Sequence, residues 1–134
     1  PECQVLMMRL ETDLVQIINY AVENNLNKLK IKWSEKKSIT IVLCAKGYPE
    51  NYIRDSEINN LSKILNNKDN QIFHAATYEK NNKIYSNGGR VLNITSLSNS
   101  LVEARNVCLD NIDKINWTDG FFRKDIGWRV INNK

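Results

Sequence analysis

The stretch "SNGGRVLNITS", residues 86–96, places two adjacent glycines before an arginine and then a run that alternates like a β-strand. The whole chain has only five glycines, so the pair needs a reason. One interpretation is a tight turn that feeds a strand, because glycine reaches positive φ without a steric penalty. The other is an anion site, in which backbone N–H groups converge on a phosphate and the arginine adds a two-point partner. The local pattern alone favours the turn, because Gly-Gly turns are common.

The strand that begins at this arginine lies between a predicted hairpin and a predicted helix. Its residues alternate over 91–95, which predicts one buried face. Residues 71–86, "QIFHAATYEKNNKIYS", predict a hairpin with Asn81 and Asn82 at its tip, because asparagine tolerates the left-handed region. Ser100 and Glu103 form a capping-box pattern at the start of a helix. The apolar face of that helix consists of Leu101, Ala104, Cys108, Ile112 and Ile115.

The first half of the chain predicts one helix and one buried strand. Apolar residues fall three and four apart over residues 4–24, which is one face of a helix. The run "SITIVLCA", residues 38–45, predicts a strand covered on both faces, and Gly47 and Pro49 end it. Residues 57–66 fit either a strand with a turn or a short helix. The predicted class is therefore α+β, an antiparallel sheet of four or five strands with two main helices.

Length, composition and charge limit the class of protein that this chain can be. The chain of 134 residues fits one domain, and 42% hydrophobic with 25% charged residues is ordinary for a globular protein. No apolar run approaches the roughly 20 residues of a membrane span, and no secretory leader pattern appears, so we expect a cytoplasmic protein. The net charge of +4 is spread among acidic residues, which suits a small phosphorylated ligand as well as a nucleic acid.

Few residues have the spacing of a catalytic or metal site. Cys3, Cys44 and Cys108 are far apart, which predicts buried thiols in a reducing compartment rather than a disulfide framework or a metal site. His74 is the only histidine, and we interpret it as structural rather than as a ligand or base. No nucleophile elbow, phosphate-binding loop or dinucleotide fingerprint is present. We therefore do not expect these residues to contain a complete active site.

The carboxy-terminal stretch is aromatic and basic. Stacking aromatics combined with phosphate-seeking cations are typical of proteins that bind single-stranded nucleic acid. The alternative is an aromatic edge of the core with solvated charges, followed by a final strand and loop. The lack of an RNA-recognition octapeptide favours the core edge, so no nucleic acid partner is expected. The residues in question are Phe121, Phe122, Arg123, Lys124, Trp128 and Arg129.

Four stretches, in order, resemble glycinamide ribonucleotide synthetase, also called phosphoribosylamine-glycine ligase. "PECQVLMMRLETDLVQII" resembles the segment after the metal-binding strand, where the family reads RFGDPE-x-Q, and "VLCAKGYPENY" resembles VLAS-G-GYP. "IFHAATYEKNNKIYSNGGRVLNITSLSNSLVEA" resembles FHAGT, NGGRVL and T-x-L-G, and "FFRKDIGWR" resembles F-YR-x-DIG. The resemblance covers nearly the whole chain. The chain departs from the family pattern at four positions: the family usually has glycine or serine in place of Lys46, glycine in place of Ala76, and Gly-Asp in place of Ser98 and Asn99.

The resemblance implies the carboxy-terminal portion of an ATP-grasp ligase. Residues 1–33 would be the terminal helix of the ATP-grasp domain and residues 34–134 the C-terminal domain, packed on amino-terminal and ATP-grasp domains that this chain lacks. The full enzyme would use ATP and magnesium to phosphorylate glycine, and the amine of 5-phosphoribosylamine would then attack, giving glycinamide ribonucleotide in de novo purine biosynthesis. ATP and magnesium would bind mainly in the missing upstream part. These residues alone would be inactive.

The resemblance also assigns candidate site residues. Gly88, Gly89 and Arg90 become the binding site for the 5′-phosphate, with Lys83 a weaker candidate for the same phosphate. Glu2 is the catalytic candidate, which orients glycine or the incoming amine, or else only stabilises the helix start through the macrodipole.

Two further alternatives stay open at this stage. Tyr48 either lines the substrate cleft or plugs the domain surface, and we favour the plug. The rival function is a free-standing basic module that binds RNA or protein. The residues before Pro1 distinguish the two functions, because the ligase predicts RFGD there and the module predicts a start codon.

Overall fold

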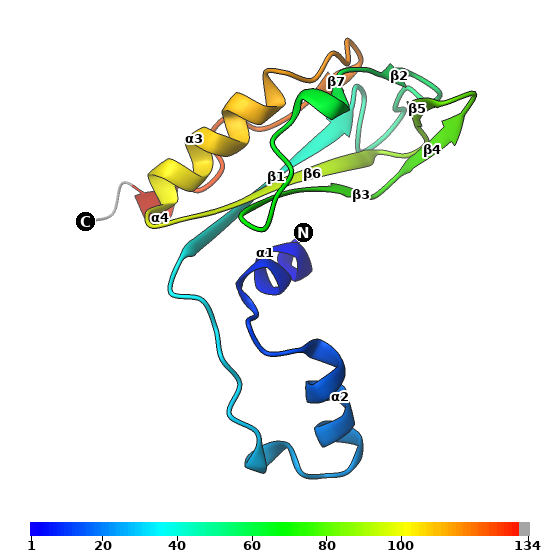
Figure 1. Cartoon of the computed structure of the whole chain (residues 1–134). Coiled ribbons are helices and arrows are strands. Elements are labelled where there is room, and N and C mark those ends of the chain that lie inside the picture. Colours follow the sequence, from blue (N-terminus) through cyan, green and yellow to red (C-terminus); the bar gives the residue numbers. More distant parts are fainter. Residues whose placement is uncertain (132–134) are drawn as a thin grey trace.

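The computed structural model describes residues 1–131 and confirms the α+β class (Figure 1). Its helices and 3-10 turns are α1 (Glu2–Arg9), α2 (Leu14–Val22), η1 (Leu26–Lys28), η2 (Leu61–Lys63), α3 (Leu101–Ile112) and α4 (Trp128–Ile131). Its strands are β1 (Lys37–Ala45), β2 (Glu57–Ile58), β3 (Asn70–His74), β4 (Thr77–Lys80), β5 (Lys83–Ser86), β6 (Arg90–Ser98) and β7 (Gly120–Phe121). None of the helices in the described part is long and apolar enough to cross a membrane.

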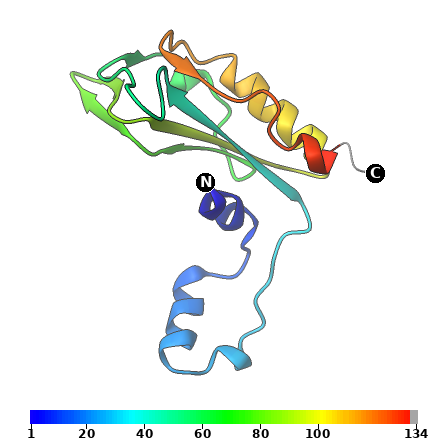
Figure 2. The same ribbon diagram turned by 180° about the vertical axis from the view of Figure 1, so that it is seen from behind.

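A four-stranded antiparallel sheet with the order β3-β6-β1-β7 forms the body of the molecule. Helix α3 covers one face of this sheet and α1 lies on the other (Figures 1 and 2). On the α3 side, Ile41, Leu92 and Ile94 are at most 1% exposed, and they pack with Ala104 and Cys108 of the helix. This layer is the hydrophobic core.

Both central strands are covered on two faces. Strand β1 alternates buried and half-buried residues, as predicted for residues 38–45. Strand β6 was predicted to bury one face, and that prediction is wrong, because residues 91–97 are all buried. The cause is the position of β6 between β3 and β1, with α3 on one face and α1 on the other.

A β-bulge interrupts the pairing of β1 with β6. Leu43 pairs with Leu92 and the next residue, Cys44, pairs with Arg90, so Val91 is the extra residue. The Val91 carbonyl accepts hydrogen bonds from the backbone N–H groups of Ala75 (3.0 Å) and Ala76 (3.2 Å). The bulge is therefore held by the turn that follows β3.

A second, three-stranded sheet with the order β2-β5-β4 extends from one end of the first. The hairpin predicted over residues 71–86 forms only over residues 77–86, because residues 70–74 form β3 and pair with β6 in the first sheet. Asn81 and Asn82 at its tip have φ of 52° and 59°, in the left-handed region. The undecided residues 57–66 form β2 and the short turn η2.

The prediction of a single helix over residues 4–24 is wrong. Helix α1 ends at Arg9, and Leu10 is extended and forms an isolated antiparallel bridge with Trp33. Helix α2 starts anew because the Asp13 side chain accepts a hydrogen bond from the backbone N–H of Gln16 at 3.0 Å, which is an N-cap. The apolar spacing continues across the break although the helix does not.

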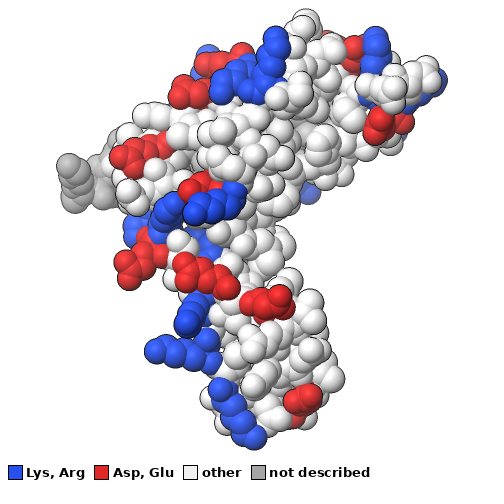
Figure 3. All heavy atoms as spheres, viewed as in Figure 1, with Lys and Arg blue, Asp and Glu red and all other residues white. Residues whose placement is uncertain are grey.

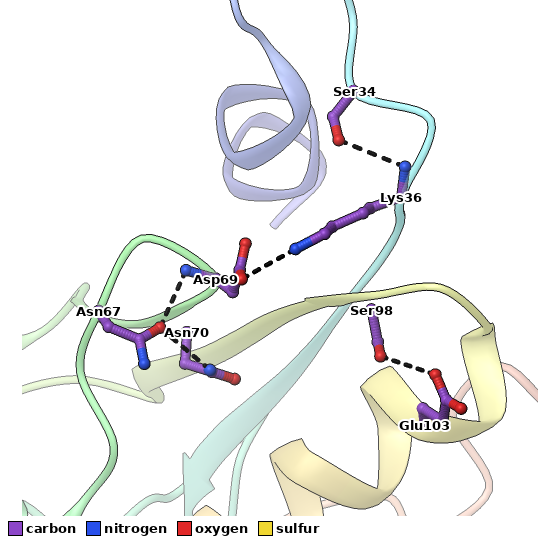
Figure 4. Close-up of polar contacts among 7 residues, drawn as sticks. All are labelled: Ser34, Lys36, Asn67, Asp69, Asn70, Ser98 and Glu103. Carbon is purple, nitrogen blue, oxygen red and sulfur yellow. Dashed lines mark hydrogen bonds and ion pairs between the residues drawn. The ribbon is translucent and has the colours of Figure 1, made fainter.

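Residues 10–33, here called the arm, extend away from the sheet (Figures 1 and 2). Its base is fixed by the Arg9 guanidinium, which donates to the Ser34 carbonyl at 2.9 Å. Beside it, Lys36 forms an ion pair with Asp69 at 2.9 Å (Figure 4). Beyond this base α2 buries none of its residues. The face of the arm in view is largely uncharged, with basic side chains along one edge (Figure 3).

The segment after α3 returns across the molecule through β7 to α4. Phe122 and Ile126 pack against the core, as a core edge requires, whereas Phe121 and Trp128 are 40% and 47% exposed. The Arg105 side chain of α3 donates to the Lys124 carbonyl and holds this segment.

Only half of the predicted capping box forms at the start of α3. The Ser100 hydroxyl accepts from the backbone N–H of Glu103 at 3.2 Å, whereas the Glu103 carboxylate accepts from the Ser98 hydroxyl at 2.8 Å (Figure 4).

Candidate functional site

The two adjacent glycines allow close packing rather than a positive φ. Neither Gly88 nor Gly89 is among the positive-φ residues of the described part, so that reason for the pair is wrong. A Cβ on Gly88 would lie 2.6 Å from the Cβ of Ala76, and a Cβ on Gly89 would overlap the ring of Tyr48. Only glycine fits beneath both neighbours, and the loop thereby delivers Arg90 to the start of β6.

Arg90 lines a pocket of about 280 Å³ between the start of α1 and the sheet. The other lining residues are Pro1, Gln4, Ala75 and Asn93. The Arg90 side chain is exposed, and within residues 1–131 it takes part in none of the ion pairs. A guanidinium that is already charged and lacks a carboxylate partner is suited to bind a planar or tetrahedral anion.

Glu2 lies at the same end of the sheet, in the first turn of α1. The pKa of its carboxyl is lowered, first by a hydrogen bond from its own backbone N–H and also by the charge of Arg90. The structure therefore brings Glu2 and Arg90 within electrostatic reach of each other. The Glu2 side chain is 90% exposed, so it is open to a ligand.

Lys83 is placed elsewhere. It lies at the tip end of β5 and donates to the Glu57 carboxylate at 2.9 Å, which raises the pKa of Lys83 and lowers that of Glu57. Three residues of strand, roughly 10 Å, separate it from Ser86, where the loop to Arg90 begins. It does not line the Arg90 pocket, so the geometry does not favour Lys83 as a second phosphate ligand.

A second, apolar pocket of about 360 Å³ lies next to the first, with Pro1 in the wall of both. Tyr48 lines this pocket, and its ring also lies against Gly89. Its role as a plug rather than a wall of the substrate cleft stays a prediction. Cys44 faces the same pocket, and burial raises the pKa of its thiol while Arg90 lowers it in part. The remaining lining residues are Thr40, Val42, Phe121, Phe122, Arg123 and Ile126.

The cysteines and the histidine show no catalytic arrangement. Cys108 is buried and Cys44 half-buried, but Cys3 is exposed, so the prediction of three buried thiols is wrong for Cys3. The His74 ring shares a hydrogen bond of 2.8 Å with the Thr77 hydroxyl across the turn between β3 and β4, which is a structural contact. Within residues 1–131, no group of three or more His, Cys, Asp or Glu residues is placed to hold a metal ion.

Two pocket residues, Gln4 and Asn93, were missed by the sequence reasoning. Asn93 had a weak signal, because it is a carboxamide in the middle of a predicted strand, but only one face of that strand was expected to be buried. Gln4 had one in the family resemblance, because it matches the glutamine of the PE-x-Q motif that also contains Glu2.

Comparison with known proteins identifies the family. Residues 38–129 match the family described as "Phosphoribosylglycinamide synthetase, C domain". This match spans more than half of the chain, and the chain belongs to that family.

Similar proteins are phosphoribosylamine-glycine ligases. The enzyme of Brucella melitensis is 40% identical over 134 residues, which is 100% of this chain and 31% of the relative. The chloroplastic enzyme of Arabidopsis thaliana is 39% identical over 136 residues, covering 100% of this chain and 26% of the relative. The crystal structure of the Thermotoga maritima ligase gives a TM-score of 0.62 at 26% identity, covering 81% of this chain and 27% of that one. The chain thus spans less than a third of the length of these relatives.

Proposed function

We propose that these residues are the carboxy-terminal part of a phosphoribosylamine-glycine ligase, which joins glycine to 5-phosphoribosylamine at the expense of ATP in purine biosynthesis. Membership of the C-domain family and the names of relatives that match over the whole chain support this. The compartment that we propose is the cytoplasm. The Arabidopsis relative, by its name, works in the chloroplast.

The described residues do not by themselves form a site for Mg²⁺, which the proposed ligase would use together with ATP. Hard divalent cations are held by clustered carboxylate oxygens, and no such cluster is formed within residues 1–131. The proposal therefore assigns both to the part of the ligase upstream of Pro1, and this chain contributes to the binding of the phosphoribosyl substrate. The chain alone should have no ligase activity.

The unpaired guanidinium of Arg90 is the observation that carries the proposal. It lines a pocket that the start of α1, the turn after β3 and strand β6 build from separate parts of the chain. In this pocket Arg90 binds the 5′-phosphate through charge-assisted hydrogen bonds. Glu2 follows Pro1, a wall residue of this pocket, lies within electrostatic reach of Arg90, and accepts a hydrogen bond from the substrate amine. The amine is thereby turned toward the activated carboxylate.

The arm supports the assignment of residues 1–33 to the ATP-grasp domain. Val15, Ile18 and Val22 of α2 are 65%, 51% and 77% exposed, although a helix normally buries such side chains. The upstream domains of the complete ligase cover this face. The domain boundary between residues 33 and 34 stays a prediction. Helix α2 stands away from the sheet of the C-terminal domain, which agrees with that boundary, whereas α1 packs on this sheet although it precedes the boundary (Figure 2).

Arg90→Ala in the complete ligase tests the proposal. A charge-assisted hydrogen bond contributes about 1.5 to 3 kcal/mol, so the dissociation constant for the phosphoribosyl ligand should rise roughly ten- to hundredfold. Arg90→Lys should recover part of this loss, because an ammonium lacks the two-point fork. ATP affinity should stay unchanged.

The matched control is Arg54→Ala. Arg54 is an exposed arginine that lies over the ring of Tyr52, 5.1 Å from its centroid, outside the pocket. Calorimetric titration of the phosphoribosyl ligand should leave this variant equal to wild type. Equal affinities of wild type and Arg90→Ala would contradict the proposed site.

A further inference from the structure

We infer that Asn93, assisted by Gln4, is a specificity-determining residue that binds a hydroxyl group of the pentose next to the phosphate held by Arg90. The inference rests on the proposed function and deepens it, since it concerns the sugar rather than the phosphate. Asn93 lies on β6 and Gln4 on α1, and both line the pocket of Arg90.

The β-bulge at Val91 places Arg90 and Asn93 in one pocket. In a regular strand, residues three apart point to opposite faces of the sheet. Here Cys44 pairs with Arg90 and Val42 with Asn93, and Cys44 and Val42 are two apart on β1, so all four side chains share the face toward α1. Bulges commonly re-aim a side chain in this way next to functional sites.

The polar groups of this pocket need more than a phosphate. Asn93 is 5% exposed, and its carboxamide takes part in none of the side-chain hydrogen bonds found within residues 1–131. The Oε1 atom of Gln4 is buried and accepts no hydrogen bond there. A buried amide oxygen without a donor costs free energy.

A phosphate dianion offers only acceptors, so it can satisfy Arg90 but not the carboxamide oxygen of Asn93. A ligand with O–H donors beside its phosphate satisfies both. The carboxamide of Asn93 can donate to and accept from the same hydroxyl. The pocket volume of about 280 Å³ lies at the small end of ligand sites, roughly 300 Å³ and upward, which fits a pentose phosphate.

The test compares two probes on the complete ligase by calorimetric titration: ribose 5-phosphate and inorganic phosphate. Asn93→Ala should weaken ribose 5-phosphate binding about five- to tenfold, the effect of one lost hydrogen bond, and change phosphate binding less than about twofold. The matched control is Asn70→Ala, because Asn70 is also a buried carboxamide of this sheet, 7% exposed, but lies outside the pocket. It should leave both affinities unchanged.

A second measurement needs no substitution and so does not depend on the folding of a variant. Wild-type ligase is titrated with 2-deoxyribose 5-phosphate and 3-deoxyribose 5-phosphate. Weaker binding of at least one of them than of ribose 5-phosphate supports a hydroxyl contact, and equal binding of all three overturns it.

Arg90→Ala separates failure of this inference from failure of the proposed function. Suppose that Arg90→Ala weakens the binding of both probes, while Asn93→Ala keeps the wild-type ratio of the affinities for ribose 5-phosphate and inorganic phosphate. In that case the inference on Asn93 is wrong and the phosphate site stands. If Arg90→Ala binds both probes as wild type does, the phosphate site itself is wrong, and the sugar contact that rests on it falls too.

Discussion

Adding one methyl group to Gly88 should destabilise the chain, and removing one from Ala76 should reverse the effect. A Cβ at position 88 would lie 2.6 Å from the Ala76 Cβ, whereas two carbon atoms normally approach to about 3.5–4.0 Å. Both atoms are attached directly to the backbone, so neither can rotate away. One of the two backbones must therefore move by about 1 Å.

The expected magnitudes follow from this overlap. Overpacking of this kind costs about 1–3 kcal/mol, so Gly88→Ala should lower the free energy of unfolding by that amount. Ala76→Gly alone should cost roughly 0.5–1 kcal/mol, through the added conformational freedom of glycine. In the double variant the new methyl occupies the vacated space, so the double variant should be about 1–2 kcal/mol more stable than the sum of the single changes predicts.

Urea unfolding of the 134-residue chain, followed by circular dichroism, measures these free energies. The control pair is Gly88→Ala with Ala75→Gly, because Ala75 is the exposed neighbour of Ala76 and its methyl does not meet position 88. That pair should be additive. Additivity in the Ala76 pair as well would refute the argument that close approach explains the glycine.

Two further predictions concern the core and the arm. Burial raises the pKa of the Cys108 thiol from 9.0 to about 11. As the pH rises, the unfolded chain therefore loses this proton before the folded chain does, so the free energy of unfolding should be unchanged below pH 9 and fall between pH 9 and 11. Urea unfolding at pH 8 and 10 measures this fall, which should be smaller in Cys108→Ala. Replacing Val15 and Val22 with lysine should change the free energy of unfolding by less than about 0.5 kcal/mol, because both are largely exposed; a larger loss in thermal melts would mean that the arm packs on the sheet.

The central sheet and α3 could be predicted because their signals are local. The apolar run over residues 38–45, the alternation over residues 91–95, the Asn81-Asn82 tip and the Ser100 cap each act within a few residues. The prediction of a single helix over residues 4–24 was wrong because the apolar spacing continues unchanged across the break between α1 and α2. The Asp13 cap acts within a few residues, whereas the bridge between Leu10 and Trp33 joins segments far apart in the chain.

The candidate site was predicted in part for the same reason. Arg90 stood out through the glycines before it, and Glu2 through its motif. The partner of Lys83 is Glu57, which lies on β2, and no local pattern shows that β2 pairs with β5. Asn93 could be seen as a polar residue in a predicted strand, but its convergence with Gln4 depends on the docking of α1 and on one unpaired residue in β6.

That single extra residue also separates two kinds of evolutionary change in β6. From Leu92 onward the strand is in register with β1 against α3, so a one-residue insertion or deletion there would turn the core residues of β6 out of the core. Between Asn87 and Val91 the chain has already absorbed one residue without disturbing that register. A one-residue change in length should therefore be tolerated better between Asn87 and Val91 than from Leu92 onward, whereas the glycines at positions 88 and 89 have to stay because larger residues would collide with Ala76 and Tyr48.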